Sequence, residues 1–342
     1  NTMALDHPLI YNVIAGSDFQ KRPIPDGMLK DNEGENISSK NKSYCELTTQ
    51  YWAWKNVEAD YYGFCHYRRF FSFNPDKLPE DDWGTVVYPA MNEKTMEELH
   101  LNEEDMRAYI EKYDFLVAKG ISTKKLLAKS VYDHYEKAPE LHIEDVKLFL
   151  NIIHEKYPEI ADTAEQFFQG KKFYPCNMFI MRKELFQEYS AMLFDILEEF
   201  EKRADMSLYS REGYRTTGHL GERMVGIFYE YLKKKGGYKL GELQIALIKD
   251  ADRQEEAEVN IADHVVPIVL AANQEYVPIL FTCAHSLVNH TSKDRQYEIY
   301  VFHTDIEPVS QKVFEEQLGC DNVHFTFIDV TRNVSGYQLK AK

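Results

Sequence analysis

The sequence predicts an α/β fold. Strand-like apolar runs alternate with amphipathic helical stretches along most of the 342 residues, a pattern typical of sheets flanked by helices. An acidic stretch without apolar periodicity interrupts this pattern at 249–260, and the alternation then starts again. We therefore predict two modules, at 1–248 and 263–342, joined by a linker at 249–262.

The first module reads as strands and helices in succession. A short strand at 8–15 precedes a polar loop that reaches residue 44 and is rich in turn-forming residues. The further strands are predicted at 60–71, 113–118 and 174–182. The helices are predicted at 45–56, 93–112, 129–170, 183–203 and 221–235, and Pro139 and Pro158 break the third of these regions.

The second module restarts with a regular β-α-β-α-β pattern. Its strands are predicted at 265–272, 297–303 and 323–330, and its helices at 276–289 and 310–318. This order is typical of the opening half of a Rossmann-like nucleotide-binding sheet. About 80 residues make only part of such a domain, so we expect a truncated unit whose apolar sheet face is incompletely covered.

Composition narrows the class of protein. A formal net charge of -16 argues against a general nucleic-acid binder, which needs a basic face. The five cysteines are scattered and form no Cys-x-x-Cys pair, so neither a zinc site nor a disulfide framework is predicted. No apolar run approaches the roughly 20 residues that span a bilayer. A cytoplasmic protein is expected, and peripheral contact with a membrane is compatible with this composition.

The most informative motif lies at the end of the predicted strand 60–71, where His66, Tyr67, Arg68 and Arg69 follow one another. In open α/β sheets, ligands bind at the carboxyl ends of strands, and the forked guanidinium donors suit a diphosphate. The alternative is an arginine pair that leaves the core and meets surface carboxylates. The pattern alone favours neither interpretation.

Four other candidates for substrate binding are polar side chains in or next to predicted elements. Asp31 and Asn36, in the loop 31–41, could bond ribose or sugar hydroxyls, although a self-bonded turn accounts for them as well. Glu46 stands at a helix start, where it could orient a sugar or only favour the helix dipole. Asn177 could bind a hydroxyl from the strand that contains it.

The segment His219 to Arg223 supplies a candidate catalytic base. Glu222 follows a glycine-bearing loop and is predicted to open a helix, a place from which it could accept a proton from a sugar hydroxyl. His219 is the reserve, and Arg223 is a candidate substrate or structural partner. The alternative is a carboxylate that pairs with a neighbour along the helix.

No metal site is predicted in the first module. Hard divalent ions prefer carboxylate ligands such as an Asp-x-Asp pair. The one literal match is Asp250-Ala251-Asp252, and its place in the acidic linker favours a solvated run of charge.

Several long motifs carry a family resemblance. They are DNEGENIS, YCELTTQYWAWKN, ADYYGFCHYRRFF, YPCNMFIMRKELF and GHLGERM, in that order. Together they resemble the capsular and exopolysaccharide synthesis family catalogued as domain of unknown function 4422, over roughly residues 8–245. The first strand that is usual in that family is expected to be missing or replaced by residues 1–7.

This resemblance implies an A-type glycosyltransferase-like fold, with a Rossmann-like mixed sheet. Some members are classed as galactofuranosyltransferases that use a UDP-linked donor, which implies inversion with a general base. His66 to Arg69 stand where such enzymes usually place Asp-x-Asp, so cations are expected to replace the metal. No cofactor is therefore expected in the first module.

The second module resembles the start of glycosyltransferase family 8 in two segments, VVPIVLAANQEYVPILFTCAHSLVNH and YEIYVFHTDI. Ala271, Ala272, Asn273 and Tyr276 match its uridine-binding start, although Asn273 stands where Asp is common. That family is retaining and uses Mn²⁺ or Mg²⁺, so a metal is expected only in the complete domain. The segment as given is expected to be inactive and to need the remainder of the domain as partner.

Two functions from different classes follow. The first is an enzyme that moves a hexose, with galactofuranose as the expected sugar, from UDP to a lipid-linked or oligosaccharide acceptor of a capsule or O-antigen. The second is a non-catalytic module that binds a nucleotide or glycan and positions a neighbouring transferase.

Overall fold

The computed structural model describes residues 5–21, 24–25, 27–249 and 265–331. The chain divides into two compact units, Asn1–Gln254 and Glu255–Lys342, which we describe separately. All of the predicted linker except Lys249 lies outside the described residues, so its bounds stay a prediction.

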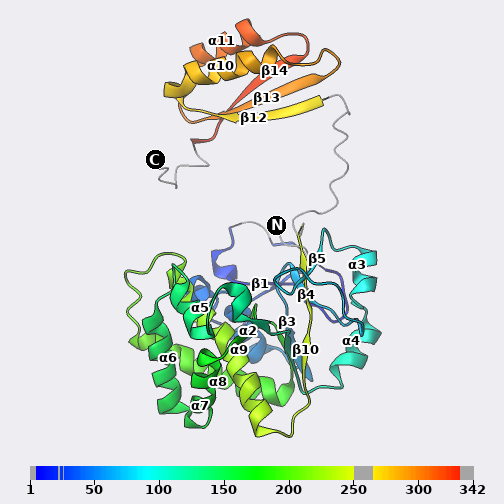
Figure 1. Cartoon of the computed structure of the whole chain (residues 1–342), viewed down its shortest axis with the longest axis vertical. Coiled ribbons are helices and arrows are strands. Elements are labelled where there is room, and N and C mark those ends of the chain that lie inside the picture. Colours follow the sequence, from blue (N-terminus) through cyan, green and yellow to red (C-terminus); the bar gives the residue numbers. More distant parts are fainter. Residues whose placement is uncertain (1–4, 22–23, 26, 250–264, 332–342) are drawn as a thin grey trace. The chain divides into compact units, whose positions relative to one another are not determined.

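A four-stranded sheet forms the centre of the first unit (Figure 1). Its order is β10-β6-β9-β3, with β10 parallel to β6 and the other neighbours antiparallel. The strands are β3 Tyr61–Phe64, β6 Phe115–Ala118, β9 Phe179–Arg182 and β10 Leu240–Leu243.

A second sheet has the order β4-β11-β5, and its strand β11 directly follows β10 of the first sheet in the sequence. Its strands are β4 Arg69–Phe71, β5 Val86–Tyr88 and β11 Ile245–Ile248. The prediction of one strand at 60–71 was therefore wrong, because β3 and β4 belong to different sheets. Between them His66 and Arg69 exchange two backbone hydrogen bonds of 3.1 and 3.0 Å and close a tight turn.

Two other predicted strands are shorter than expected. The strand at 8–15 is reduced to β1 Val13–Ile14, which pairs with β2 Leu29–Lys30. The strand at 174–182 starts only at Phe179, because Cys176 and Asn177 have positive φ angles of 74° and 48°. The strands β7 Ile121–Ser122 and β8 Lys172–Phe173 form a small antiparallel pair. In the sequence, β7 follows β6 and β8 precedes β9.

Helices flank these sheets, and the strongest periodic pattern was predicted best. The helix predicted at 183–203 is α8 Lys183–Arg203. The others are α1 Asn41–Tyr44, α2 Leu47–Asn56, α3 Glu93–Glu98, α4 Glu103–Ile110, α5 Val131–Lys137, α6 Ile143–Lys156, α7 Pro158–Gln169 and α9 Thr216–Lys235. Short 3-10 turns are η1 Ser17–Phe19, η2 Ser38–Lys40, η3 Thr123–Leu126 and η4 Gly213–Arg215.

Helix α9 begins five residues before the predicted start at Gly221, so Glu222 lies within the helix and does not open it. The glycines of this segment serve close packing. A Cβ on Gly221 would lie 2.6 Å from the side chain of Leu47, and one on Gly218 would lie 3.2 Å from Cys45 Sγ. Glycine here lets α9 approach the start of α2 closely.

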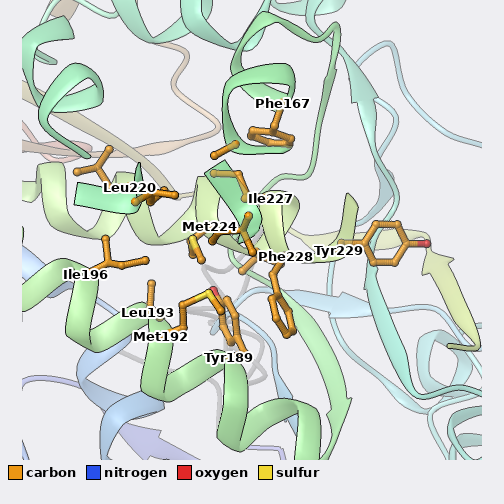
Figure 2. Packing of buried hydrophobic residues seen from close by; sticks show 14 of the residues in the cluster. Phe167, Tyr189, Met192, Leu193, Ile196, Leu220, Met224, Ile227, Phe228 and Tyr229 are labelled. Carbon is orange, nitrogen blue, oxygen red and sulfur yellow. The ribbon is translucent and has the colours of Figure 1, made fainter. Parts of the chain in front are cut away.

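Strand β6 separates two apolar cores. Phe115 and Val117 face the larger core, and Leu116 and Ala118 face the smaller one, as expected for alternating side chains. Figure 2 shows the larger core where α8 meets α9. There the side chains of Tyr189, Leu193 and Ile196 lie opposite those of Leu220, Met224 and Phe228. This packing fixes the position of α9, which carries Glu222.

The second unit is a parallel sheet with the order β12-β13-β14 (Figure 1). Its elements are β12 Val265–Ala271, η5 Gln274–Tyr276, α10 Val277–Val288, β13 Gln296–His303, α11 Pro308–Leu318 and β14 Val323–Asp329. Both helices pack with Ile299 and Val301 in one core. On the strands, Val269 and Phe302 are 59% and 38% exposed, so one sheet face is open within the described residues.

Candidate functional site

A cleft of about 1750 Å³ runs along β3 in the first unit. One end of it gathers polar side chains from four separate segments. Glu46 comes from the start of α2, His66 from the turn after β3, Asn177 from the turn before β9, and Arg215 from the last residue of η4. The rest of the wall is largely apolar. This polar end is the candidate site.

The turn after β3 holds the predicted cation motif. His66 and Tyr67 line the cleft, and their rings lie 4.5 Å apart. The guanidinium of Arg68 lies 5.4 Å from the Tyr67 ring. Burial lowers the pKa of His66 to about 4, and the charges of Arg69, Arg68 and Arg215 add to this effect. His66 is therefore neutral near pH 7 and offers a single ring N–H.

Three arginines surround His66. Arg68 and Arg69 are half-buried, and neither forms an ion pair within the described part of the chain. Nε of Arg68 is buried without a hydrogen-bond partner there. Neither of these two side chains lines the cleft, contrary to the sequence prediction that both face a ligand. Arg215 does line it.

Arg215 was missed by the sequence analysis. Its Nη1 pairs with Glu212 at 2.9 Å, and its Nε donates to Cys45 Sγ at 3.3 Å. One indication of a role for this residue was present in the sequence. Arg215 comes shortly before the glycine-bearing segment 218–224, in a loop to which no other function was assigned. Among the cations that line the cleft, Arg215 is the one whose charge acts on His66.

Four carboxylates line the cleft, and Glu46 is the one that Asn177 contacts; the others are Asp60, Glu111 and Glu212. Nδ2 of Asn177 donates to it at 3.4 Å. Burial raises the pKa of Glu46, and the negative charge of Glu222 raises it further. Asn177 is itself buried, and its Oδ1 has no partner among the described residues. Glu46 is thus a carboxylate that accepts a proton more readily than an exposed glutamate does.

Glu222 lies behind this wall and does not line the cleft. Its carboxylate accepts a hydrogen bond from the backbone N–H of Cys176 at 2.5 Å and forms an ion pair with Arg223. The Arg223 guanidinium is buried between the rings of Phe173 and Tyr135, at 4.8 and 5.4 Å. Both carboxylate oxygens are engaged inside the protein, which does not fit the predicted role as base.

His219 and Arg223 also lie outside the cleft wall. Burial lowers the pKa of His219, and the nearby charge of Arg223 adds to this. The backbone carbonyl of His219 accepts a hydrogen bond from Arg223 Nη1 at 3.3 Å. The position of Arg223 favours the structural role among its two predicted roles.

Backbone strain is concentrated at this site. Cys45, Cys176 and Asn177 have φ angles of 52°, 74° and 48°. Such values are uncommon for residues other than glycine, and each costs on the order of 1–3 kcal/mol. Two of these residues lie next to Glu46 or bond to it, so the strain is stored where the cleft carboxylate is positioned.

Asp31 and Asn36 are engaged within their own loop. The fully buried Asp31 carboxylate accepts hydrogen bonds from Gly16 N, Ser17 N, Ser38 Oγ and Thr48 Oγ1, at 2.6 to 2.9 Å. Asn36 bonds Gly34 O and Ser38 N. Neither side chain lines the cleft. Their positions support the self-bonded turn and not the predicted contact with a substrate.

The residues predicted for nucleotide binding in the second unit gather after β12. Ala271 ends that strand, and Ala272 N donates to Phe302 O at 3.1 Å. Asn273 caps η5 by accepting from Tyr276 N at 3.2 Å, and Tyr276 is 51% exposed. Their role in uridine binding stays a prediction.

Neither a cluster of metal ligands nor a membrane-spanning helix occurs among the described residues. Within these ranges no group of three or more His, Cys, Asp or Glu side chains could hold a metal ion. Asp250, Ala251 and Asp252 lie outside them. No described helix is long and apolar enough to cross a membrane.

Comparison with known proteins agrees with this architecture. The chain is similar to a solved structure described as the bifunctional glycosyltransferase WbbM in its apo form, with 32% identity and a TM-score of 0.71. The match covers 97% of this chain and 58% of that protein. No curated protein matches the sequence. Residues 1–235 match the family described as domain of unknown function DUF4422, and the chain therefore belongs to that family.

Proposed function

We propose that the first unit is a glycosyltransferase that binds a nucleotide-sugar donor in the cleft beside β3. One observation carries the proposal. The cleft brings the cation Arg215 and the neutral N–H donor His66 together with Glu46, a carboxylate whose pKa is raised by burial. Transfer of a sugar from a diphosphate needs these two kinds of group. The likeness to a bifunctional glycosyltransferase supports the same activity.

The donor diphosphate would bind at the cation end. Arg215 can contact it directly from the cleft wall, and His66 can donate its ring N–H. Arg68 and Arg69 lie close enough to lower the pKa of His66, so their charges would also stabilise a diphosphate there. Charge-assisted bonds of guanidinium to phosphate are among the strongest polar contacts in proteins. These cations offset the charge of leaving UDP in the proposed site, with no metal required.

Glu46 would act as the general base. The acceptor hydroxyl oxygen attacks the anomeric carbon, the bond from that carbon to the UDP oxygen breaks, and the hydroxyl proton passes to Glu46. The configuration at the anomeric carbon is inverted in the product, and UDP is the leaving group. A base with a pKa near the working pH is the most effective one, and burial brings Glu46 toward that range.

Glu222 would position this base. It fixes the backbone of Cys176, and the next residue, Asn177, donates to Glu46. The hydrogen bond from Cys176 holds this turn to α9, and the ion pair with Arg223 orients the Glu222 carboxylate. Glu222 thus sets the geometry and charge around Glu46 without contact with the reacting atoms.

The finer parts of the proposal follow from the family resemblance. The donor is a UDP-hexose, with UDP-galactofuranose as the expected one. The acceptor is a lipid-linked or oligosaccharide chain of a bacterial surface polysaccharide, assembled in the cytoplasm. The second unit is the start of a family 8-like domain whose Mn²⁺ or Mg²⁺ site belongs to the complete domain.

A donor screen tests this function against the alternative of a binding module. UDP-galactofuranose, UDP-galactose and UDP-glucose would be offered to the chain, with UDP release and UDP affinity both measured. Turnover of one donor, with UDP binding in the same cleft, is expected. Binding of UDP without release from any donor, with or without oligosaccharide acceptors, would favour the non-catalytic module.

A further inference from the structure

A lysine-rich surface lies on the first unit outside the cleft. It comprises Lys124, Lys125, Leu127 and Lys129, from η3 and the turn after it, with Lys171. The backbone N–H of Thr123 donates to Lys171 O at 2.9 Å, and β7 pairs with β8 next to this bond. Two segments far apart in the sequence are thereby held side by side. We call this set the lysine surface.

The charge of the lysine surface is compensated only in part, since Lys129 acts on the nearby carboxylate of Asp133. Its four lysines are exposed, and none forms an ion pair within the described part of the chain. Neighbouring lysines do have partners. Lys137 pairs with Asp133 at 2.8 Å, and Lys172 pairs with Glu242 at 2.5 Å. A group of free cations is unusual in a chain of net charge -16.

Leu127 is an exposed apolar side chain within the lysine surface. It ends η3 in the left-handed conformation, with φ 56° and ψ 30°, and it is 87% exposed. Glycine or asparagine would occupy this conformation at lower cost. The leucine side chain buries almost nothing within the unit, so it contributes little to the fold. An apolar side chain held in solvent among lysines fits a partner that is both anionic and apolar.

Trp83 adds a second exposed apolar side chain nearby. It is 57% exposed, and a Cβ on the next residue, Gly84, would lie 3.4 Å from Ile121 and 3.7 Å from Lys125 Nζ. Asp81 is exposed as well, and its Oδ1 accepts hydrogen bonds from the backbone N–H groups of Trp83 and Thr85. Asp82 is exposed beside Trp83 and opposes an anionic partner.

We propose that the lysine surface docks the chain on an anionic lipid bilayer. The lysines would lie at the headgroups, while Leu127 and Trp83 enter the interfacial region, where tryptophan and leucine are favoured. A soluble polyanion would use the lysines but would have no use for the exposed leucine. No residue of the lysine surface lines the cleft, so the inference goes beyond the proposed transferase activity and does not depend on it.

A second run of lysines, Lys233 to Lys235, provides a comparison. It lies in the last turn of α9, where cations stabilise the helix dipole. Lys233 pairs with Glu230, and Lys234 donates to Thr163 and Gln166 at 3.1 and 2.7 Å. These contacts account for the run within the fold. Its replacement by glutamine removes the same charge as a triple change in the lysine surface.

Vesicle flotation of the whole chain tests the proposal. The vesicles would contain phosphatidylcholine alone or with phosphatidylglycerol. Binding is expected only to the second kind, and high salt should release it because exposed charges are screened. The triple variant K124Q/K125Q/K129Q should lower the partition coefficient by about two orders of magnitude. Leu127→Asn, which keeps the backbone conformation accessible, should lower it about tenfold.

The control K233Q/K234Q/K235Q should bind as the unchanged chain does, and circular dichroism should show that every variant is folded. Equal binding to both kinds of vesicle, no binding to either, or equal loss in the two triple variants would overturn the proposal. So would Leu127→Asn with unchanged binding, since a purely ionic surface would then suffice and a soluble polyanion would be an equal partner.

Discussion

The Glu222 carboxylate accepts a hydrogen bond from the backbone N–H of Cys176 at 2.5 Å, and so fastens helix α9 to the strained turn before β9. The same carboxylate pairs with the buried guanidinium of Arg223. Asn177, the next residue in the turn, donates to Glu46 at the cleft wall. The cleft carboxylate is therefore held by a chain of contacts that begins inside the protein.

Glu222→Gln should lower the free energy of unfolding, because Glu222 pairs with the buried Arg223. The amide oxygen can still accept from Cys176 N, but the buried Arg223 loses its counter-charge. Removal of one partner of a buried ion pair typically costs about 3–5 kcal/mol, and the partly exposed Glu222 places this change at the lower end. Urea unfolding measures it. A variant as stable as the unchanged chain would show that the pair has no positioning role.

Ligand binding should raise the pKa of His66. In the free protein, burial and then the charges of Arg69, Arg68 and Arg215 lower this pKa to about 4. A diphosphate beside the ring adds negative charge, which favours the protonated form and moves the pKa upward. NMR titration of the His66 ring with and without UDP checks this. A pKa that stays unchanged at saturating UDP would place the diphosphate elsewhere.

Arg215→Ala should weaken UDP binding by about tenfold to a hundredfold, since hydrogen bonds to charged groups contribute roughly 1.5–3 kcal/mol each. Calorimetry measures the affinity. Arg107→Ala is the matched control, because Arg107 also lines the cleft and also pairs with a neighbouring glutamate, but it is not among the arginines whose charge acts on His66. Equal effects of the two changes would indicate that net charge, and not a specific contact, determines binding.

Turnover by the first unit should be unaffected by EDTA. Cations of the protein take the place of a metal in the proposed site, so chelation removes nothing that the reaction needs. UDP release would be measured before and after chelation. Activity that is lost with EDTA and restored by Mn²⁺ would contradict this account and would direct attention to carboxylates such as Asp250 and Asp252.

Much of the fold could be predicted from the sequence, because long amphipathic helices carry a strong periodic signal. Helix α8 is the best case, and the alternation in the second unit was also predicted in the right order. The break between β3 and β4 was missed, because the turn at Tyr67 and Arg68 contains no glycine, proline or asparagine to mark it. The early start of α9 was missed because glycines are typical of loops. In α9 they instead permit close packing on Cys45 and Leu47.

The site was predicted less well, since it depends on contacts between distant segments. Periodicity cannot show that Asp31 accepts hydrogen bonds from its own loop and from Thr48 of α2, or that Glu222 is turned inward to Cys176. Glu46 and His66 were found because each lies in a long distinctive motif. Arg215 lies in a polar loop without such a motif, and only the fold brings it to His66.

The central claim is that Glu46 accepts the proton of the acceptor hydroxyl, and the turnover of Glu46→Gln tests it most directly. The substitution keeps the shape of the side chain and the contact with Asn177 but removes the basic group. With the best donor from the screen, kcat should fall by about two to four orders of magnitude, the usual contribution of a general base, while UDP affinity stays nearly unchanged. The acidic limb of the pH–rate profile, which the raised pKa of Glu46 places above the usual range for glutamate, should disappear as well. A kcat close to that of the unchanged enzyme would contradict the assignment.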